Sequence, residues 1–183
     1  MDYYSEEEVA ARELRRAAYH EVGHKVMCEH FGGTGCAVVW RNRSGNSEES
    51  AWQGQFRPRI SPEAQHRARS ANGLHVPALP PNWKELVGMA GLLAEELLIG
   101  ETDDAEVVAF NMYVTIKHGA ASATDLEAMG ISDATNFDLS YDVVERGMGI
   151  LRKAWARVQS EAESLIADAI ASERLVSVDG SCL

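Results

Sequence analysis

The sequence predicts a mainly α (α+β) fold with one small β-hairpin. Its 183 residues are a typical length for one domain, so we treat 1–183 as a single domain. Long stretches of good helix formers lie between residues that cap helix N-termini and glycines that end helices. Two short, β-prone segments flank one polar loop. These three observations predict several helices beside one pair of strands.

The first expected helix runs from about residue 6 to about residue 31. Ser5 and Glu8 have the spacing of a capping box, in which each side chain accepts a hydrogen bond from a free backbone N–H of the first turn. Good helix formers follow without interruption, and Gly32 and Gly33 provide the stop.

The remaining elements follow from similar capping, proline and glycine signals. They are, in chain order, strands at 36–40 and 51–56, helices at 62–71, at 83–99 and from 103 or 104 to 118, a short helix from about 124, a long helix from about 141 to 171, and a short strand at 175–178.

The charge balance argues against several classes of partner. Lys and Arg total 17 against 28 Asp and Glu, which gives a formal net charge of −11. Nucleic acids and anionic membrane surfaces both need a cationic face, so we expect neither as a partner. Three cysteines without a C-x-x-C pair are typical of free thiols in a reducing compartment, and the first residues lack the pattern of a signal peptide. We therefore expect a cytoplasmic protein.

His20-Glu21-Val22-Gly23-His24 is an H-E-x-x-H sequence inside the first expected helix. Residues i and i+4 lie on one helical face, so both imidazoles can reach one metal ion, and imidazole suits Zn²⁺. Glu21 lies about 100° round the helix, where its carboxylate can act as general base on a water molecule whose pKa the metal lowers to roughly 7. About 0.02 chance matches are expected in a chain of this composition. The motif therefore predicts zinc at His20 and His24, with Glu21 catalytic.

Several blocks of the chain resemble the peptidase domain of the FtsH-type ATP-dependent zinc metallopeptidases. The most specific is the segment 17–26 around H-E-x-x-H, which resembles the opening A-x-H-E-A-G-H-A block of that family. Further similar blocks follow in the family's order: the strand pair 38–40 and 52–56, the A-E-E-L helix at 88–100, the D-L-E segment at 119–127, and the final helix with its closing turn at 171–175. The resemblance implies a helical zincin-like domain that hydrolyses peptides or unfolded proteins.

The resemblance also implies a third zinc ligand, which falls on Asp125. Zinc sites in enzymes usually have three protein ligands and one open position, so one more ligand is needed beside the two histidines. Asp103 and Asp104 remain alternatives, because they open a helix-sized insertion at 101–118 relative to the family pattern. Glu95 or Glu96 is expected to orient a ligand imidazole from outside the metal site.

The expected substrate site is the edge of the second strand. Trp52, Gln53, Gly54, Gln55 and Phe56 would pair with an extended peptide by β-augmentation. No phosphate-binding loop of the G-x-x-x-x-G-K-[ST] type is present, so we expect no use of ATP and substrates that are flexible or already unfolded.

A second hypothesis is a non-catalytic binding or regulatory module that retains a structural metal site. The helix-sized insertion and the missing ATPase motif motivate it. In that case a fourth protein ligand, such as Cys28 or an additional carboxylate, would close the open position of the metal.

Overall fold

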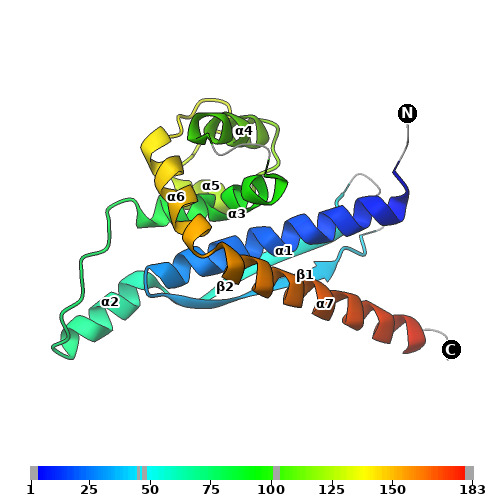
Figure 1. Ribbon diagram of the computed structural model, residues 1–183, viewed down its shortest axis with the longest axis horizontal. Helices are drawn as coiled ribbons and strands as arrows, with labels where there is room; N and C mark the ends of the chain where they lie inside the picture. Colours follow the sequence, from blue (N-terminus) through cyan, green and yellow to red (C-terminus); the bar gives the residue numbers. More distant parts are fainter. Residues whose placement is uncertain (1–3, 45, 47–48, 101–103, 180–183) are drawn as a thin grey trace.

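The computed structural model describes residues 4–44, 46, 49–100 and 104–179, and this part of the chain is mainly helical with one two-stranded antiparallel sheet (Figure 1). This confirms the predicted mainly α class with a small hairpin. The elements are α1 (Glu6–His30), β1 (Thr34–Arg41), β2 (Trp52–Ile60), α2 (Pro62–Ala71), α3 (Trp83–Ile99), α4 (Ala105–Lys117), α5 (Ala123–Met129), α6 (Tyr141–Lys153) and α7 (Trp155–Asp179).

The capping box predicted at the start of α1 is present. The backbone N–H of Glu8 donates to Ser5 Oγ at 3.2 Å, and the backbone N–H of Ser5 donates to Glu8 Oε2 at 2.8 Å. At the other end the chain turns through Gly32, whose φ of 87° is a left-handed conformation that favours glycine. The helix therefore begins and ends where the sequence indicates.

The two strands pair antiparallel with Val38 opposite Gln55. Both strands are longer than predicted, because the ladder continues beyond Phe56 to Ile60. Pro58 lies inside this extension. Proline is tolerated there because each strand of a two-stranded sheet has one edge without a partner strand.

Two predictions for the C-terminal part are wrong. The expected long helix is divided at Ala154 into α6 and α7, which diverge because α6 packs on α3 and α4 while α7 packs on α1 and β1. The expected strand at 175–178 is part of α7. A strand there would need a partner for its backbone N–H and C=O groups, whereas a continuing helix pairs these groups internally.

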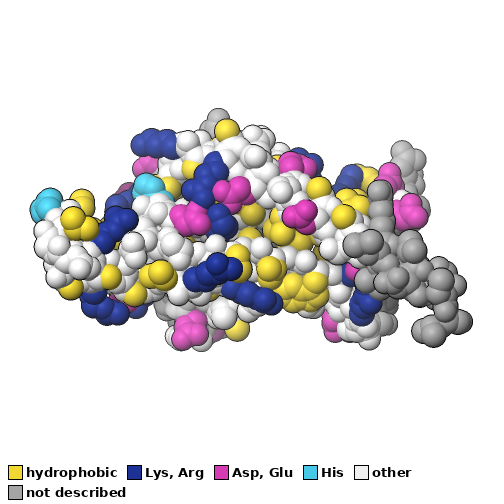
Figure 2. All heavy atoms as spheres, turned by 90° about the horizontal axis from the view of Figure 1, so that it is seen from below, with side chains coloured by type: hydrophobic (Ala, Val, Ile, Leu, Met, Phe, Trp, Pro, Cys, Tyr) yellow, Lys and Arg dark blue, Asp and Glu magenta, His cyan; other side chains and the backbone are white. Residues whose placement is uncertain are grey.

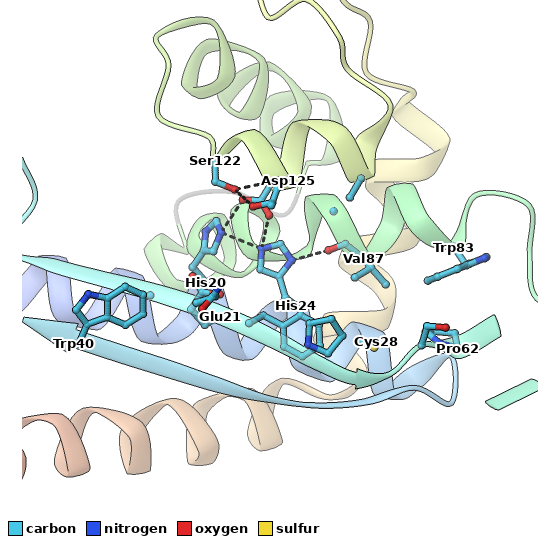
Figure 3. A pocket seen from close by; sticks show the side chains of 18 residues that line it. His20, Glu21, His24, Cys28, Trp40, Pro62, Trp83, Val87, Ser122 and Asp125 are labelled. Carbon is cyan, nitrogen blue, oxygen red and sulfur yellow. Dashed lines mark hydrogen bonds and ion pairs between the residues drawn. The ribbon is translucent and has the colours of Figure 1, made fainter. Parts of the chain in front are cut away.

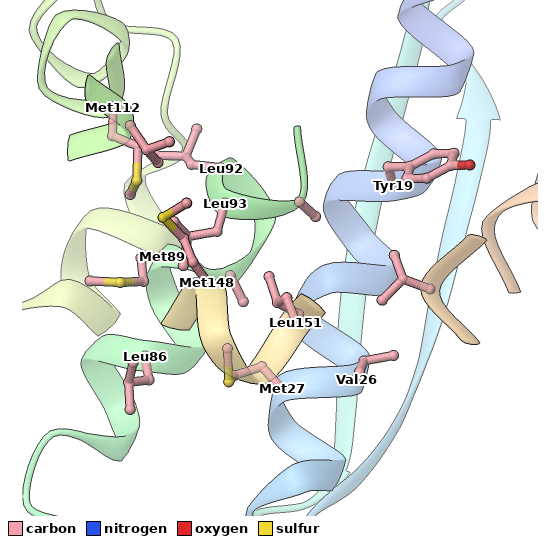
Figure 4. Close-up of a cluster of buried hydrophobic side chains, with 14 of the residues drawn as sticks. Tyr19, Val26, Met27, Leu86, Met89, Leu92, Leu93, Met112, Met148 and Leu151 are labelled. Carbon is pink, nitrogen blue, oxygen red and sulfur yellow. The ribbon is translucent and has the colours of Figure 1, made fainter. Parts of the chain in front are cut away.

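The main core lies between α1, α3, α4 and α6 and is rich in methionine (Figure 4). Flexible thioether side chains fill the irregular space between helices of different direction. The core holds α1 and α3 against each other, and these two helices carry most of the residues discussed below. Its largest fully buried side chains include Tyr19, Met27, Leu86, Met89, Leu93, Met112, Ile116, Met148 and Leu151.

The described surface mixes both signs of charge. On the face seen from below, Lys and Arg side chains lie among Asp and Glu side chains, with apolar side chains between them (Figure 2). Among the described residues, the helices lack a stretch that combines the length and the hydropathy needed to cross a membrane.

Candidate metal centre

His20 and His24 lie one turn apart on α1 and face Asp125 of α5 (Figure 3). The two Nε2 atoms are 3.0 Å apart. Asp125 places Oδ2 3.3 Å from His20 Nε2 and Oδ1 3.2 Å from His24 Nε2. Residues 105 positions apart in the chain therefore meet in one cluster.

The far side of each imidazole ring is fixed by a hydrogen bond. His24 Nδ1 donates to the backbone carbonyl of Val87 at 2.7 Å, and His20 Nδ1 lies 2.7 Å from Glu95 Oε1. With the Nδ1 proton directed to an acceptor, the Nε2 atom of a neutral imidazole presents a lone pair to the cluster. Glu95 thus holds the place predicted for an orienting carboxylate, whereas Glu96 instead accepts a hydrogen bond from Asn111.

The three side chains fit a zinc ion in number and spacing. One ligand atom of each residue lies within 4.8 Å of the others, and His20, His24 and Asp125 are the only such group of three among the described residues. Bonds of about 2.0–2.1 Å in a tetrahedral site place ligand atoms about 3.3 Å apart. The observed separations of 3.0–3.3 Å are close to this spacing.

Asp125 is aimed at the histidines and does not cap its own helix. The N-cap of α5 is Ser122, whose Oγ accepts a hydrogen bond from the backbone N–H of Asp125 at 3.1 Å. Asp104, in contrast, caps α4 by accepting from the backbone N–H of Glu106 at 2.9 Å. Asp103, the other alternative, lies outside the described residues. Among the described candidates, the structure brings Asp125 to the histidines.

The cluster changes the protonation of its members. Burial opposes a charged His20, but hydrogen bonds with Asp125 and Glu95 outweigh it and raise the pKa of His20 from 6.5 to about 10. Burial likewise opposes a charged Asp125, yet its hydrogen bonds with His20 and His24 hold its pKa well below the usual range. In the folded chain without metal, the His20 imidazole is therefore protonated at pH 7 and lies between the carboxylates of Asp125 and Glu95.

Glu21 lies beside the cluster without belonging to it. Burial raises the pKa of its carboxyl group, while the charges of His20 and His24 oppose that rise. Strand β2 passes so close that a Cβ added at Gly54 would lie 2.5 Å from Glu21 Cγ. A side chain at position 54 would therefore displace the Glu21 carboxylate from this place at the wall of the pocket, and glycine leaves room for it.

A pocket of about 620 Å³ opens over the cluster. Gly54, Gln55 and Phe56 of the predicted substrate strand line it. Trp52, at the start of β2, instead packs against the N-terminal half of α1, in a separate apolar cluster with Leu14. Gln53 is exposed. The pocket thus uses the C-terminal three of the five residues that the sequence indicated.

Some lining residues were not predicted from the sequence. Trp83 and Pro62 lie at one end of the pocket and Trp40 at the other (Figure 3). The carbonyl of Val87 is also new, and a backbone acceptor leaves no signal in a residue pattern. Trp83, a large aromatic residue at the first position of α3, could have been recognised in the sequence as a candidate for the pocket wall.

Cys28 lines the pocket but does not complete a fourth ligand position. It lies one turn beyond His24, and burial raises the pKa of its thiol to about 11. Cys28 is also outside the one group of potential ligands found among the described residues.

Comparison of the chain with models of known protein families gives no match. Comparison with curated protein sequences gives none either. The assignment of this site therefore depends on its residues and their geometry.

Glu95→Gln is expected to weaken zinc binding by about 10- to 100-fold, because a neutral amide holds the His20 imidazole less firmly than a carboxylate. Zinc titration against a competing chelator measures the change. Glu96→Gln is the matched control, since this neighbouring residue contacts Asn111 and not His20. Equal affinities of the two variants would contradict the role of Glu95.

Zinc binding at pH 7 is expected to release close to one proton. The folded-state pKa of His20 is raised to about 10, so the imidazole is charged at pH 7, whereas a metal ligand must be neutral. Zinc affinity should therefore fall as pH decreases and rise as pH approaches 10. Calorimetry in two buffers of different ionisation enthalpy counts the proton, and a heat independent of buffer would contradict the prediction.

Proposed function

We propose that this protein is a zinc-dependent metallopeptidase of the FtsH-like, zincin-like type, which hydrolyses flexible or unfolded polypeptides. The observation that carries the proposal is the cluster of His20, His24 and Asp125, with zinc-like spacing, beside Glu21 at the wall of one pocket. His20, His24 and Asp125 would hold the metal. When bound, zinc supplies Lewis-acid polarisation of a peptide carbonyl and lowers the pKa of a coordinated water molecule.

Glu21 would act as the general base. It lies next to His20 on α1 and faces the pocket, but it is not one of the three clustered ligands. Its raised pKa brings the carboxyl group closer to neutral pH, which is the direction that a general base requires. Glu21 would take a proton from the attacking water and deliver it to the amine that leaves.

Strand β2 provides a surface for an extended peptide. Its backbone from Gly54 to Phe56 lines the pocket beside Glu21. A peptide that adds to this strand pairs through its own backbone N–H and C=O groups, which must not already be hydrogen-bonded within a folded structure. The site therefore favours flexible segments over folded domains. The pocket has an apolar wall at the end opposite Trp40. This wall is formed by Pro62, Trp83 and Val87, and it would accept an apolar side chain next to the cleaved bond.

Incubation of the zinc-loaded chain with a library of unstructured peptides tests the proposal. Mass spectrometry is expected to show new peptide termini, with apolar residues on one side of the cleaved bond and no cleavage after chelation. A tightly folded protein is the control substrate and should remain intact. Zinc binding without hydrolysis of any peptide would overturn the peptidase proposal and favour a non-catalytic module with a structural metal site.

A further inference from the structure

Helix α4 has two apolar faces, and only one of them is covered. Its inner face packs into the main core through Ala105, Val108, Met112 and Ile116. Val107, Phe110 and Val114 lie on the opposite face, at the i, i+3, i+7 spacing of one helical stripe. Their exposed fractions are 43%, 66% and 36%, and Phe110 is among the most exposed large apolar side chains of the described chain.

Two opposite charges lie near the ends of this stripe. Glu106 is in the first turn of α4, and Lys117 is in its last turn. Together with Phe110 and Tyr113 they follow i, i+4, i+7, i+11 spacing, so all four lie on one side of the helix, and Lys117 Nζ donates to the Tyr113 hydroxyl at 3.1 Å. Eleven residues of helix separate Glu106 from Lys117 by about 16 Å, which is too far for them to pair within one molecule.

We propose that the outer face of α4 binds the same face of a second copy, with the two helices antiparallel. A twofold axis beside the middle of the helix brings the end with Glu106 next to the partner's end with Lys117, twice in one interface. It also places Phe110 against the apolar stripe of the other copy. The face is complementary to itself, because its acid and its base lie at opposite ends of one apolar stripe.

The charge of the face favours this occupant over an unrelated one. The chain carries a formal net charge of −11, which repels a second copy overall, whereas one acid and one base, Glu106 and Lys117, lie near the two ends of the stripe. Figure 1 places α4 at the upper edge of the molecule, with α3 and α6 between it and α1. Pairing through α4 therefore leaves the pocket open, and the inference does not depend on the proposed peptidase activity.

We expect a dimer Kd of about 1 µM or lower, so light scattering after size exclusion, with the wild type at about 100 µM, should give the mass of a dimer. Phe110→Asp should raise the Kd about 1,000-fold, to about 1 mM, and so give a mostly monomeric protein at this concentration, because it places two carboxylates inside the apolar contact. Leu74→Asp is the control: Leu74 is 59% exposed and lies outside α4, so this variant should remain a dimer. A monomeric wild type, or a dimer that survives Phe110→Asp, would overturn the proposal.

Charge reversal tests the antiparallel register. E106K leaves only positive charges at the two positions and K117E only negative ones, so each variant alone should be monomeric. An equimolar mixture of E106K and K117E should recover the dimer, since each copy then meets the opposite charge at both ends. Circular dichroism checks that both variants fold. A wild-type dimer together with a mixture that stays monomeric would show that Glu106 does not meet Lys117 of a second copy.

Discussion

Glu21→Gln is expected to reduce peptide hydrolysis by about 10²- to 10⁴-fold while zinc still binds. Glutamine has the shape of glutamate, so it fits the narrow space against Gly54, but its amide cannot accept the proton from water. Glu21 lies outside the group of three clustered ligands, so its replacement leaves the donors of the metal unchanged. Single-turnover cleavage of a fluorogenic peptide, with zinc content measured on the same sample, separates the two effects.

Glu127→Gln is the matched control for this experiment. Glu127 is an exposed glutamate of α5, two residues beyond Asp125, and it does not line the pocket. Its substitution should leave both hydrolysis and zinc binding at the wild-type level. Full activity in Glu21→Gln would show that another group takes the proton, and the role assigned to Glu21 would then be wrong.

The local part of the site could be predicted from sequence because it depends on helix geometry alone. The spacing of His20 and His24 places both rings on one face of α1 whatever the remaining chain does. The capping box at Ser5 and Glu8 predicted where that helix begins, and the structure has it there. The position of Glu21 next to His20 followed from the same periodicity.

The distant part of the site required the fold. Nothing in the pattern around Asp125 states that α5 packs on α3 opposite the two histidines, and only the family resemblance pointed to this residue. The structure brings Asp125 to within 3.3 Å of His20, and its role as a ligand stays a prediction. The carbonyl of Val87 and the ring of Trp83 enter the site through the packing of α3, which periodicity cannot position.

The errors near the C-terminus have a similar origin. Residues 154–179 contain no proline or glycine, so no helix-ending residue in this segment predicts the division at Ala154. It arises because α6 and α7 pack on different partners. The β-prone composition of 175–178 gives way to the continuing helix, since propensity is a weak preference that the surrounding structure overrides.

Asp125→Ala is expected to weaken zinc binding by more than about 100-fold. Loss of a residue that only hydrogen-bonds to a metal ligand costs up to about 100-fold, and loss of a ligand itself should cost more. The substitution removes one of three donors and leaves only the two imidazoles of α1. Asp104→Ala should instead retain wild-type zinc affinity and lose about 1 kcal/mol of folding stability, because Asp104 caps α4. Asp125→Asn keeps the shape of the side chain and removes its charge. Weaker zinc binding in this variant as well would show that the effect in Asp125→Ala is not a folding defect.

Zinc titrations of the variants at positions 125, 104 and 103 decide between the candidates for the third ligand. Asp125 is favoured because its two oxygens lie 3.2–3.3 Å from the two Nε2 atoms, while its backbone N–H is satisfied by Ser122. An aspartate whose only task was to start a helix would not be buried against two histidines. Wild-type affinity in Asp125→Ala, together with loss of zinc in Asp103→Ala or Asp104→Ala, would place the ligand in the insertion and not in α5.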